Sequence, residues 1–456
     1  MADKFDIVVV GSGPGGYVAA VRAAQVGLKT AIVEREERLG GRCLREACIP
    51  AKAMLRAADV LAEAQDGEQM GVIAEGIRFD IAAAGKRRDR VIKTLTSGVA
   101  GLMKKNEVEV FHGHGSLTEG RNVAVDGREL ETEKVLLATG SVPLPIPGTE
   151  FGERVLDTAA MWAMNEQPAK LAVVGAGASG AEIASGFGRY GTEVLLLEML
   201  DQVLPAEDAE IAKLVQRELK KQNITVATGT RVDEVKPSGK GVELVYGGDR
   251  TTVDYLCIAA GRTPDIEGLG LDKAGVKVGE DRLVEVDDHM RTSAEGVYAI
   301  GDMVHGPALA HKSMDEGVIA AEDAAGRPVH PLSYDDIPGA TFCHPQVGSF
   351  GLTEAQAKER GHDVVVGNFP YGGVGAPLVY GDRTGFIKIV GDKRYGELLG
   401  AHIVGARATD LISELVVAKQ LEAGYEEVAR TIHAHPTFSE AVMEAARATS
   451  GWAIHI

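Results

Sequence analysis

A glycine-rich motif that occurs twice constrains this chain more than any other feature. Residues 11–16 read Gly-Ser-Gly-Pro-Gly-Gly and residues 175–180 read Gly-Ala-Gly-Ala-Ser-Gly, an offset of 164 residues. Each copy follows a short apolar run and precedes an alanine-rich stretch of helical character. A second apolar run then ends at an acid, Glu34 or Glu198. Strand, G-x-G-x-x-G turn, helix, strand and acid are the parts of a dinucleotide-binding fold, so the sequence predicts two of them.

The spacing of the glycines also indicates the ligand. Glycines in such a turn let the backbone approach a pyrophosphate, which then lies at the positively polarised N-terminus of the helix. The acid accepts hydrogen bonds from an adenosine ribose. Glu198 would repel a 2′-phosphate, and no Lys or Arg occurs from there to Ala209, so we expect NAD rather than NADP in the second fold. The predicted contacts are Gly11, Gly13, Gly16 and Glu34 in the first copy and Gly175, Gly177, Gly180 and Glu198 in the second.

Three further apolar runs end at glycines and would complete the two sheets. They are residues 134–138, 254–260 and 296–300. An acid directly after such a strand can bind ribityl or ribose hydroxyls, which makes Asp302 a candidate contact. Prolines at 143, 145 and 147 predict a crossing between domains. The cofactor contacts added here are Gly115, Thr139, Gly140, Ser141, Gly301 and Asp302 at the first site and Gly261 at the second.

Composition excludes several classes of protein. The net charge of −18 weighs against a nucleic-acid binder, whose affinity rests on Lys and Arg contacts to phosphate, and against docking on anionic membranes. No uninterrupted apolar run approaches 18 residues, so no membrane span is expected. The N-terminus has no signal-peptide layout, and we expect a cytoplasmic enzyme. Two charged segments, 86–90 and 205–222, are expected to form a solvated helix face and an amphipathic helix without visible chemistry.

The four cysteines are too few for a disulfide scaffold, but two of them form a close pair. Cys43 and Cys48 have four residues between them, and in a cytoplasmic protein such a pair is usually catalytic or metal-binding. Zinc normally needs four ligands, while Cys257 and Cys343 stand singly in apolar strand-like runs as expected core residues. The pair is therefore interpreted as a redox disulfide, and no metal site is expected. A helix predicted from Ile49 would favour a thiolate at Cys48.

Together these features resemble the pyridine nucleotide–disulfide oxidoreductases, and the resemblance covers essentially the whole chain. It implies FAD at the first glycine motif and a nicotinamide cofactor at the second. It places the Cys43–Cys48 disulfide against one flavin face and the nicotinamide against the other. Lys52 matches the family lysine near flavin N5, and Glu182 matches its ion-pair partner.

The C-terminus refines the resemblance. His433-Ala-His435-Pro436-Thr-Phe-Ser-Glu440 matches the H-x-H-P-T-x-x-E signature of the dihydrolipoamide dehydrogenases. A dihydrolipoyl thiol is mostly protonated at neutral pH, so thiol–disulfide exchange at Cys43 needs a base. Histidine titrates in the right range, and a carboxylate beyond the ring holds its tautomer, which assigns these roles to His435 and Glu440. His433 is a candidate supporting group.

The expected fold class is α/β, with two Rossmann-like dinucleotide-binding domains for FAD and NAD and an α+β C-terminal dimerisation domain. The predicted bounds are 1–146 for the first part of the FAD domain, 147–265 for the NAD domain, 266–334 for a segment that completes the FAD domain, and 335–456 for the interface domain. The resemblance implies an obligate homodimer in which His435 and Glu440 of one chain serve the cysteines of the other. It implies dihydrolipoamide or a lipoyl-bearing protein as substrate. The acidic composition would suit a basic docking domain of a lipoyl acyltransferase complex.

The redox loop departs from the family pattern and leaves alternatives open. The departures are Arg42, Arg45, Glu46 and Ala47, where the family has Thr, Asn, a hydrophobic residue and Gly, together with Ala51 and Ala178. Either the arginines stabilise a thiolate and shift the disulfide potential, or they face solvent or pair with Glu46. The chain could accordingly be an NADH-dependent reductase of another disulfide. A flavoprotein scaffold or NADH oxidase with a vestigial disulfide is a further alternative.

Overall fold

The computed structural model describes residues 4–119 and 121–455, which divide into two compact units. The first unit contains the chain up to Ala53 together with Ala82–Leu144 and Gly261–Tyr334. The second contains Met54–Ile81, Pro145–Ala260 and the chain from Asp335 onward. The boundary after Leu144 lies within the run of prolines at 143, 145 and 147.

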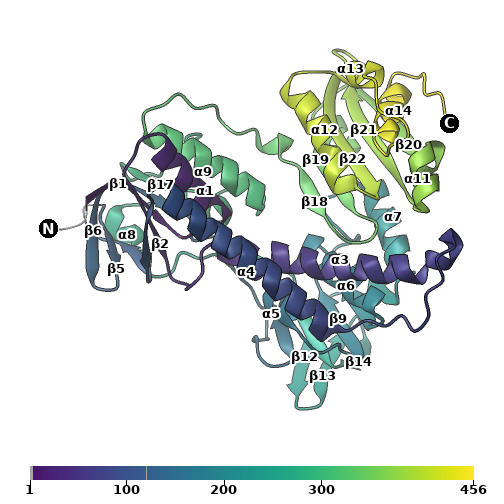
Figure 1. The fold of residues 1–456 in the computed structure, drawn as a ribbon, viewed down its shortest axis with the longest axis horizontal. Helices are drawn as coiled ribbons and strands as arrows, with labels where there is room; N and C mark the ends of the chain where they lie inside the picture. The colour runs from purple at the N-terminus through teal and green to yellow at the C-terminus, as the bar shows by residue number, and fades with distance from the viewer. Residues whose placement is uncertain (1–3, 120, 456) are drawn as a thin grey trace. The chain divides into compact units, whose positions relative to one another are not determined.

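A parallel sheet with the strand order β3-β2-β1-β6-β17 forms the centre of the first unit (Figure 1). Its central strand is apolar almost throughout, and Ile7, Val8 and Val9 are fully buried, because helices and loops cover both faces of a parallel sheet. The long strand β6 also pairs through its first half with an antiparallel β5–β4 ribbon. The strands are β1 (Lys4–Val10), β2 (Thr30–Glu34), β3 (Glu109–His112), β4 (Gly115–Leu117), β5 (Val123–Val125), β6 (Arg128–Leu137) and β17 (Val297–Ala299).

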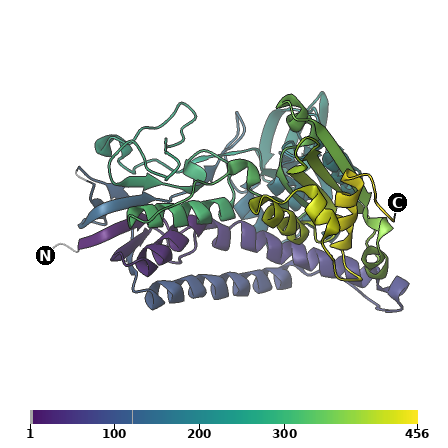
Figure 2. The same ribbon diagram turned by 90° about the horizontal axis from the view of Figure 1, so that it is seen from above.

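Two helices lie side by side in this unit, α1 (Pro14–Gln25, purple) and α9 (Ala310–Ala324, green) (Figure 2). Glycines permit their close approach, since a Cβ on Gly317 would lie 2.6 Å from the carbonyl oxygen of Gly15. The first of these helices begins at Pro14, inside the glycine motif, because proline is well tolerated in the first turn. The other helical elements that begin or lie here are α2 (Gly41–Arg45), α3 (Cys48–Gln65), α4 (Ile81–Lys105), α8 (Leu271–Ala274), η2 (Gly301–Met303) and η3 (Tyr334–Asp336).

The chain leaves the first unit through one short strand and returns through another, and these two strands pair with each other. Strand β7 (Ser141–Pro143) is antiparallel to β16 (Arg262–Pro264), with Ser141 opposite Pro264. A side chain on the outgoing strand therefore lies beside one on the returning strand.

The second unit repeats the parallel arrangement, with strand order β11-β10-β9-β15-β8. The helix that follows the second glycine turn, α6 (Ala178–Tyr190), ends at Gly191 in a left-handed conformation. These two parallel sheets confirm the predicted α/β class. The remaining elements of this segment are η1 (Gly67–Met70), β8 (Val155–Asp157), α5 (Thr158–Ala163), β9 (Lys170–Val174), β10 (Glu193–Leu197), α7 (Ala209–Leu219), β11 (Ile224–Ala227), β15 (Tyr255–Ile258) and an antiparallel sheet of β12 (Val232–Ser238), β13 (Gly241–Tyr246) and β14 (Asp249–Val253).

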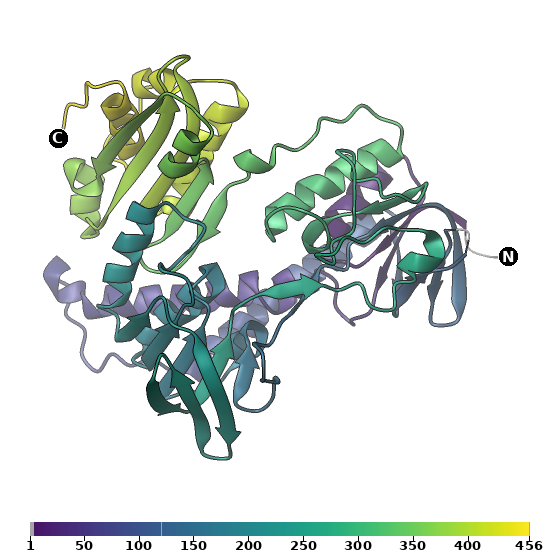
Figure 3. The same cartoon turned by 180° about the vertical axis from the view of Figure 1, so that it is seen from behind.

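The C-terminal part of the second unit is an antiparallel sheet with the order β18-β19-β22-β21-β20 (Figure 3). Ile387, Ile389 and Ala401 point to one face, where α12 and α14 cover them with an apolar core. An α+β domain therefore follows the dinucleotide-binding segments, as predicted. The strands are β18 (Gly339–Thr341), β19 (Val347–Gly351), β20 (Val364–Pro370), β21 (Gly385–Asp392) and β22 (Glu397–Gly405), and the helices are α10 (Glu354–Glu359), η4 (Tyr371–Gly373), α11 (Gly375–Tyr380), α12 (Ala408–Gln420), α13 (Tyr425–Arg430) and α14 (Glu440–Thr449).

The opposite face of this sheet carries a buried polar row. Lys388 alternates with its apolar neighbours along β21, is 2% exposed, and reaches Asp208 at 3.1 Å and Glu210 at 2.9 Å. Asp208 also caps the N-terminus of α7 through the backbone N–H of Glu210. The dinucleotide-binding segment of the second unit is thus tied to the C-terminal sheet by charge.

Two sequence expectations need correction. In the charged segment of α4, Arg88 is buried and only 5% exposed, so the face is not wholly solvated. Its guanidinium pairs with Asp89 on the same helix. Cys343 is buried as expected but lies after the end of β18 rather than within a strand. The segment 205–222 does form an amphipathic helix, α7.

Candidate active site

The first glycine turn joins β1 to α1, and the structural reason for a glycine differs among its three glycine positions. Gly11 has φ +100°, and a Cβ there would lie 2.4 Å from the carbonyl oxygen of Ala138. A Cβ on Gly16 would lie 1.9 Å from the carbonyl oxygen of Gly11. At Gly13, which precedes the first helical residue, a Cβ would have nothing within 4 Å. Packing therefore accounts for two of the glycines, and the third keeps the helix N-terminus accessible to an anionic ligand.

The second turn, between β9 and α6, repeats this geometry. Gly175 has φ +96°, and a Cβ there would lie 2.6 Å from the carbonyl oxygen of Ala259. A Cβ on Gly180 would lie 1.8 Å from the carbonyl oxygen of Gly175, while one on Gly177 would have nothing within 4 Å. Both turns fit a dinucleotide pyrophosphate for the same physical reason.

The acid of each repeat is held by the turn itself. Glu34 accepts hydrogen bonds from the backbone N–H of Ser12 at 2.9 Å and of Glu36 at 3.0 Å. Glu198 accepts the equivalent pair, from Ala176 at 2.7 Å and from Leu200 at 2.9 Å. A carboxylate has about four acceptor sites, so both acids retain capacity for ribose hydroxyls.

The remaining predicted cofactor residues of the first unit gather around the end of β6. The Ser141 hydroxyl donates to Asp302, and Arg262 Nε donates to the Ser141 oxygen at 2.7 Å. Thr139 donates to the carbonyl oxygen of Asp265 at 2.7 Å. Gly140 and Gly301 adopt left-handed conformations with φ +77° and +80°. These residues lie together at the carboxyl end of the sheet, where ligands of such folds bind.

Two predicted glycine contacts have other surroundings. A Cβ on Gly115 would lie 2.9 Å from Val10 Cγ1, so packing against the sheet already requires a glycine there. Gly261 has φ +153° and a Cβ there would meet nothing within 4 Å. Their contacts with FAD and NAD stay predictions.

The redox loop places both cysteines at helix positions of the first unit. Cys43 lies in α2 and Cys48 is the first residue of α3. The two sulfurs are not joined by a disulfide here, and the Cys43 thiol is hydrogen-bonded to Cys48. This hydrogen bond and burial raise the pKa of the Cys43 thiol far above its ordinary value, while the positive charge of Lys52 opposes the rise. Lys52, one turn into α3, is thus close enough to act on the pair.

For Arg45, the contacts in the structure favour one of the two interpretations of the redox loop. Arg45 contacts Glu36 at 3.3 Å and Glu46 at 3.7 Å, and its Nε donates to the carbonyl oxygen of Gly41. The charge that lowers the pKa of Cys43 is that of Lys52, so Arg45 acts as the partner of neighbouring carboxylates. This arrangement supports the alternative in which it pairs with Glu46 over direct stabilisation of a thiolate.

Glu182 lies in α6 and is 4% exposed. Its carboxylate accepts a hydrogen bond from the backbone N–H of Phe342 at 2.9 Å, which joins the helix to the strand β18 region of the same unit. Its role as the ion-pair partner of Lys52 stays a prediction.

His435 and Glu440 form the pair that the C-terminal signature predicts. Nδ1 of His435 lies 2.9 Å from Glu440 Oε1, and the backbone N–H of Thr437 donates to Oε2 at 2.9 Å. Burial would raise the pKa of Glu440, but these hydrogen bonds and the histidine charge hold it below its ordinary value. The His435 side chain is 75% exposed while that of Glu440 is 14% exposed. The carboxylate is fixed, and the ring presents its other nitrogen outward.

His433 forms a second histidine–carboxylate pair. Its Nε2 contacts Glu414 of α12, and its Nδ1 lies 2.9 Å from the carbonyl oxygen of Thr431. The hydrogen bond to Glu414 raises the pKa of His433, although burial works against it. Both ring nitrogens are occupied, so His433 supports the local backbone and does not present a free base.

Sequence reasoning missed several residues that build the site. Ser12 donates both its backbone N–H and its hydroxyl to Glu34, and Arg262 holds Ser141. Lys312 and Glu316 bind the two polar groups of Gly301. In sequence, a lysine and a glutamate one helical turn apart resemble an ordinary exposed ion pair, so the local pattern does not indicate that these two are buried.

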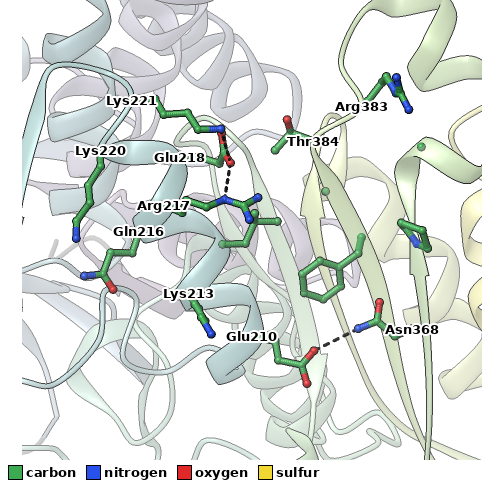
Figure 4. A pocket seen from close by; sticks show the side chains of 15 residues that line it. Glu210, Lys213, Gln216, Arg217, Glu218, Lys220, Lys221, Asn368, Arg383 and Thr384 are labelled. Carbon is green, nitrogen blue, oxygen red and sulfur yellow. Dashed lines mark hydrogen bonds and ion pairs between the residues drawn. The ribbon is translucent and has the colours of Figure 1, made fainter.

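A groove outside these residues lies between α7 and the strands β20 and β21 (Figure 4). Arg217 and Lys221 pair with Glu218, and Glu210 bonds Asn368. Figure 4 shows Lys220 on the far side of the helix from the strands. Its cationic side chains do not converge, so the groove is not a built anion site. No helix among residues 4–119 and 121–455 has the length and apolar character needed to cross a membrane.

Comparison with known proteins extends these findings. The model of the pyridine nucleotide-disulphide oxidoreductases matches residues 5–317, and that of their dimerisation domain matches residues 337–446. The chain is 43% identical to a dihydrolipoyl dehydrogenase of Thermus scotoductus, over 99% of each chain, and 40% identical to one of Bacillus subtilis, over 100% of each. Among solved structures it resembles LpdA from Mycobacterium tuberculosis, with a TM-score of 0.91 and 26% identity over 98% of this chain and 99% of that one. It also resembles the HOCl-induced flavoprotein disulfide reductase RclA from Escherichia coli, with a TM-score of 0.86 and 26% identity over 98% and 99%.

The two roles of glycine in the second turn can be separated by substitution. Gly177→Ala should leave the melting temperature unchanged, because its Cβ meets no protein atom, but should raise the Kd for NAD by about tenfold or more because the pyrophosphate loses its close approach. Gly180→Ala should lower stability by about 1–3 kcal/mol, since its Cβ overlaps a carbonyl oxygen. Calorimetry and titration of NAD would check both. Equal effects of the two variants on stability would contradict this division.

The His433–Glu414 pair predicts a pH-dependent stability. The raised pKa of His433 means that its stabilisation is complete below the ordinary histidine pKa and is lost as the pH rises through the raised value. Glu414→Gln should therefore lower the melting temperature more at pH 6 than at pH 9, by an amount worth about 1 kcal/mol or less. Glu359→Gln, an exposed position on α10, is the control and should show no such difference. A loss independent of pH would disprove the pairing.

Proposed function

Because this chain belongs to the pyridine nucleotide-disulphide oxidoreductase family, we propose that it oxidises dihydrolipoyl groups with NAD. The resemblance read from the cysteine pair and the C-terminal signature is confirmed, and the chain is an FAD-dependent disulfide oxidoreductase that uses FAD and NAD. The substrate is proposed from the relatives named dihydrolipoyl dehydrogenase and from the His435–Glu440 pair, whose outward ring nitrogen is the observation that carries it.

The residues of the two turns would hold the cofactors. We assign FAD to the turn of Gly11–Gly16 with Glu34, Ser141 and Asp302, and NAD to the turn of Gly175–Gly180 with Glu198. Bound there, FAD supplies the two-electron carrier through which reducing equivalents pass from the cysteines to NAD. The open approach at Gly13 and Gly177 supports both assignments.

The acid–base step follows from the orientation of His435. Since Glu440 occupies Nδ1, the ring accepts the proton of a substrate thiol at Nε2, and the carboxylate then stabilises the imidazolium. The low pKa of Glu440 keeps that carboxylate charged across the neutral range.

The sulfur chemistry uses the cysteine pair in its oxidised form. The substrate thiolate attacks Cys43, the Cys43–Cys48 bond breaks, and Cys48 leaves as a thiolate. The second substrate thiol, deprotonated in turn, attacks the substrate sulfur of the mixed disulfide, closes the lipoyl ring and releases Cys43. The substrate loses two electrons and the cysteine pair gains them, which leaves Cys43 and Cys48 as a dithiol.

A homodimer completes this site in our proposal. The dimerisation domain supports the assembly, and His435 is 75% exposed in the single chain. Exposed apolar side chains occur on α11 and in nearby segments, with the Met70 methyl beside Gly381; the patch is defined here as Met70, Leu378, Val379, Tyr380 and Ile432. The Tyr380 ring lies 5.5 Å from that of Phe438, which follows the signature histidine closely. Exposed apolar patches of this kind mark interfaces, so His435 would meet the cysteines of a second subunit.

The natural partner in this proposal is a lipoyl-bearing protein. The net charge of −18 supports docking by a basic domain of a lipoyl acyltransferase complex. The relatives' names do not extend to such a complex, so binding to the isolated docking domain would have to be measured.

The reaction can be tested directly on the purified holoenzyme. With dihydrolipoamide and NAD, NADH should form rapidly, and Cys43→Ser should lower the rate by at least about a thousandfold because the mixed disulfide cannot form. Absorbance of NADH measures both. If NADH reduces the flavin but dihydrolipoamide gives no turnover, the altered redox loop serves another disulfide and the protein is an NADH-dependent reductase. Undiminished function in a Cys48→Ser variant would instead indicate a flavoprotein with a vestigial disulfide.

The patch predicts how assembly and turnover are linked. Val379→Asp places a charge on a side chain that is 73% exposed in the single chain, and should shift the protein toward monomer and lower turnover by about tenfold or more while FAD stays bound. Sedimentation and flavin absorbance would measure the two effects. Tyr395→Asp, at a side chain 76% exposed in the β21–β22 turn, is the matched control and should remain dimeric and active. A fully active monomer would disprove the shared site.

A further inference from the structure

A fully buried ion pair lies in α9 of the first unit. Lys312 Nζ is 3.2 Å from Glu316 Oε1, and both side chains are 0% exposed. Removing two charges from water carries a large desolvation cost, and apolar residues of similar volume often stabilise a fold equally well or better. Burial raises the pKa of Glu316 even though Lys312, the Gly301 N–H and Tyr334 oppose the rise. Fold stability alone is therefore a poor explanation for this pair.

The pair holds both polar groups of one residue. The backbone N–H of Gly301 donates to Glu316 Oε2 at 2.8 Å, and Lys312 Nζ donates to the carbonyl oxygen of Gly301 at 2.8 Å. Gly301 has φ +80°, a conformation that only glycine adopts readily. The same carbonyl oxygen accepts the backbone N–H of Val304 at 3.2 Å in the short helix η2, so the ion pair and η2 together fix the two peptide groups that flank Gly301.

Because Gly301 is held in this way, the position of the next residue, Asp302, is also constrained. Its carboxylate accepts the Ser141 hydroxyl, and Arg262 supports that serine at 2.7 Å. The backbone of Asp302 is thus set by α9, and its side chain is set by the paired strands β7 and β16. On the far side, the Tyr334 hydroxyl donates to Glu316 Oε1 at 2.7 Å and completes the carboxylate's partners.

We propose that Lys312 and Glu316 are positioning residues that fix the Gly301–Asp302 peptide so that Asp302 retains the flavin cofactor. The pair serves cofactor retention, and the fold does not need it. This inference rests on the assignment of Asp302 to the FAD site.

The decisive variant replaces the pair by apolar residues, Lys312→Met with Glu316→Leu. In the full chain after flavin removal, its melting temperature should stay close to that of the wild type, since no unpaired charge is left buried and only the Gly301 N–H and the Tyr334 hydroxyl lose an acceptor. The holoenzyme should release FAD about tenfold faster or more, because charge-assisted hydrogen bonds to Gly301 are lost. Free-flavin fluorescence after dilution measures release. A wild-type release rate in this variant would overturn the proposal.

Two controls keep the result specific. Lys388→Met breaks a buried ion pair of the second unit, so it should lower the melting temperature without changing flavin release. If it accelerates release as much as the double variant, general destabilisation is the cause and the proposal falls. Asp302→Asn should itself accelerate release; if it does not, the assignment of Asp302 to FAD fails, whichever way the pair behaves.

A milder variant covers the case in which the double variant does not fold. Tyr334→Phe removes only the hydroxyl that bonds Glu316, and should accelerate FAD release by about two- to fivefold. No change in release with this variant, in a protein whose other properties are those of the wild type, would also count against the proposal.

Discussion

Both nucleotide-binding halves of this chain depend on one close contact, between the first glycine of each turn and the carbonyl end of the neighbouring strand. Gly11 faces the carbonyl of Ala138, and Gly175 faces that of Ala259, at separations that no side chain would tolerate. The contact brings two parallel strands and a helix N-terminus together at one edge of the sheet. Because the strands are parallel, every later strand of the sheet ends at that edge too, and its terminal residues become available to the same ligand.

The chemistry is divided between parts of the chain with different physical requirements. The cysteines lie at the start of a helix, beside a lysine whose charge favours a thiolate. The proposed base, His435, lies on a C-terminal segment, where Glu440 is fixed by the backbone of Thr437 while His435 remains exposed. A carboxylate held by backbone beneath a solvent-exposed ring is suited to proton transfer across an interface. It is poorly suited to a buried site within one chain.

Much of this could be predicted from the sequence because it rests on local patterns. The glycine turns, the acids and the histidine signature are short motifs, and the sequence spacing of their residues determines their local structure. The structure places each of them where the pattern requires, and the first helix begins at Pro14, inside the glycine motif. The pairing of Arg45 with Glu36 was not predictable, because it depends on how the redox loop folds back toward the acid of the first repeat.

Charged side chains show where local reasoning fails. Lys312 and Glu316 have the spacing of a solvent-exposed helix pair, and Lys388 lies in a strand with apolar neighbours, yet all three are buried. Each binds a residue outside its own helix or strand: Lys312 and Glu316 bind Gly301, 11 and 15 residues away, and Lys388 binds Asp208 before α7, 180 residues away. The desolvation cost of a buried charge is offset only when a partner is held in a fixed position beside it. Such partners are positioned by the tertiary fold and not by the local sequence. Lys312, Glu316 and Lys388 therefore lie where separate elements of the chain are joined, and the joint at Gly301 lies beside Asp302, the proposed flavin contact.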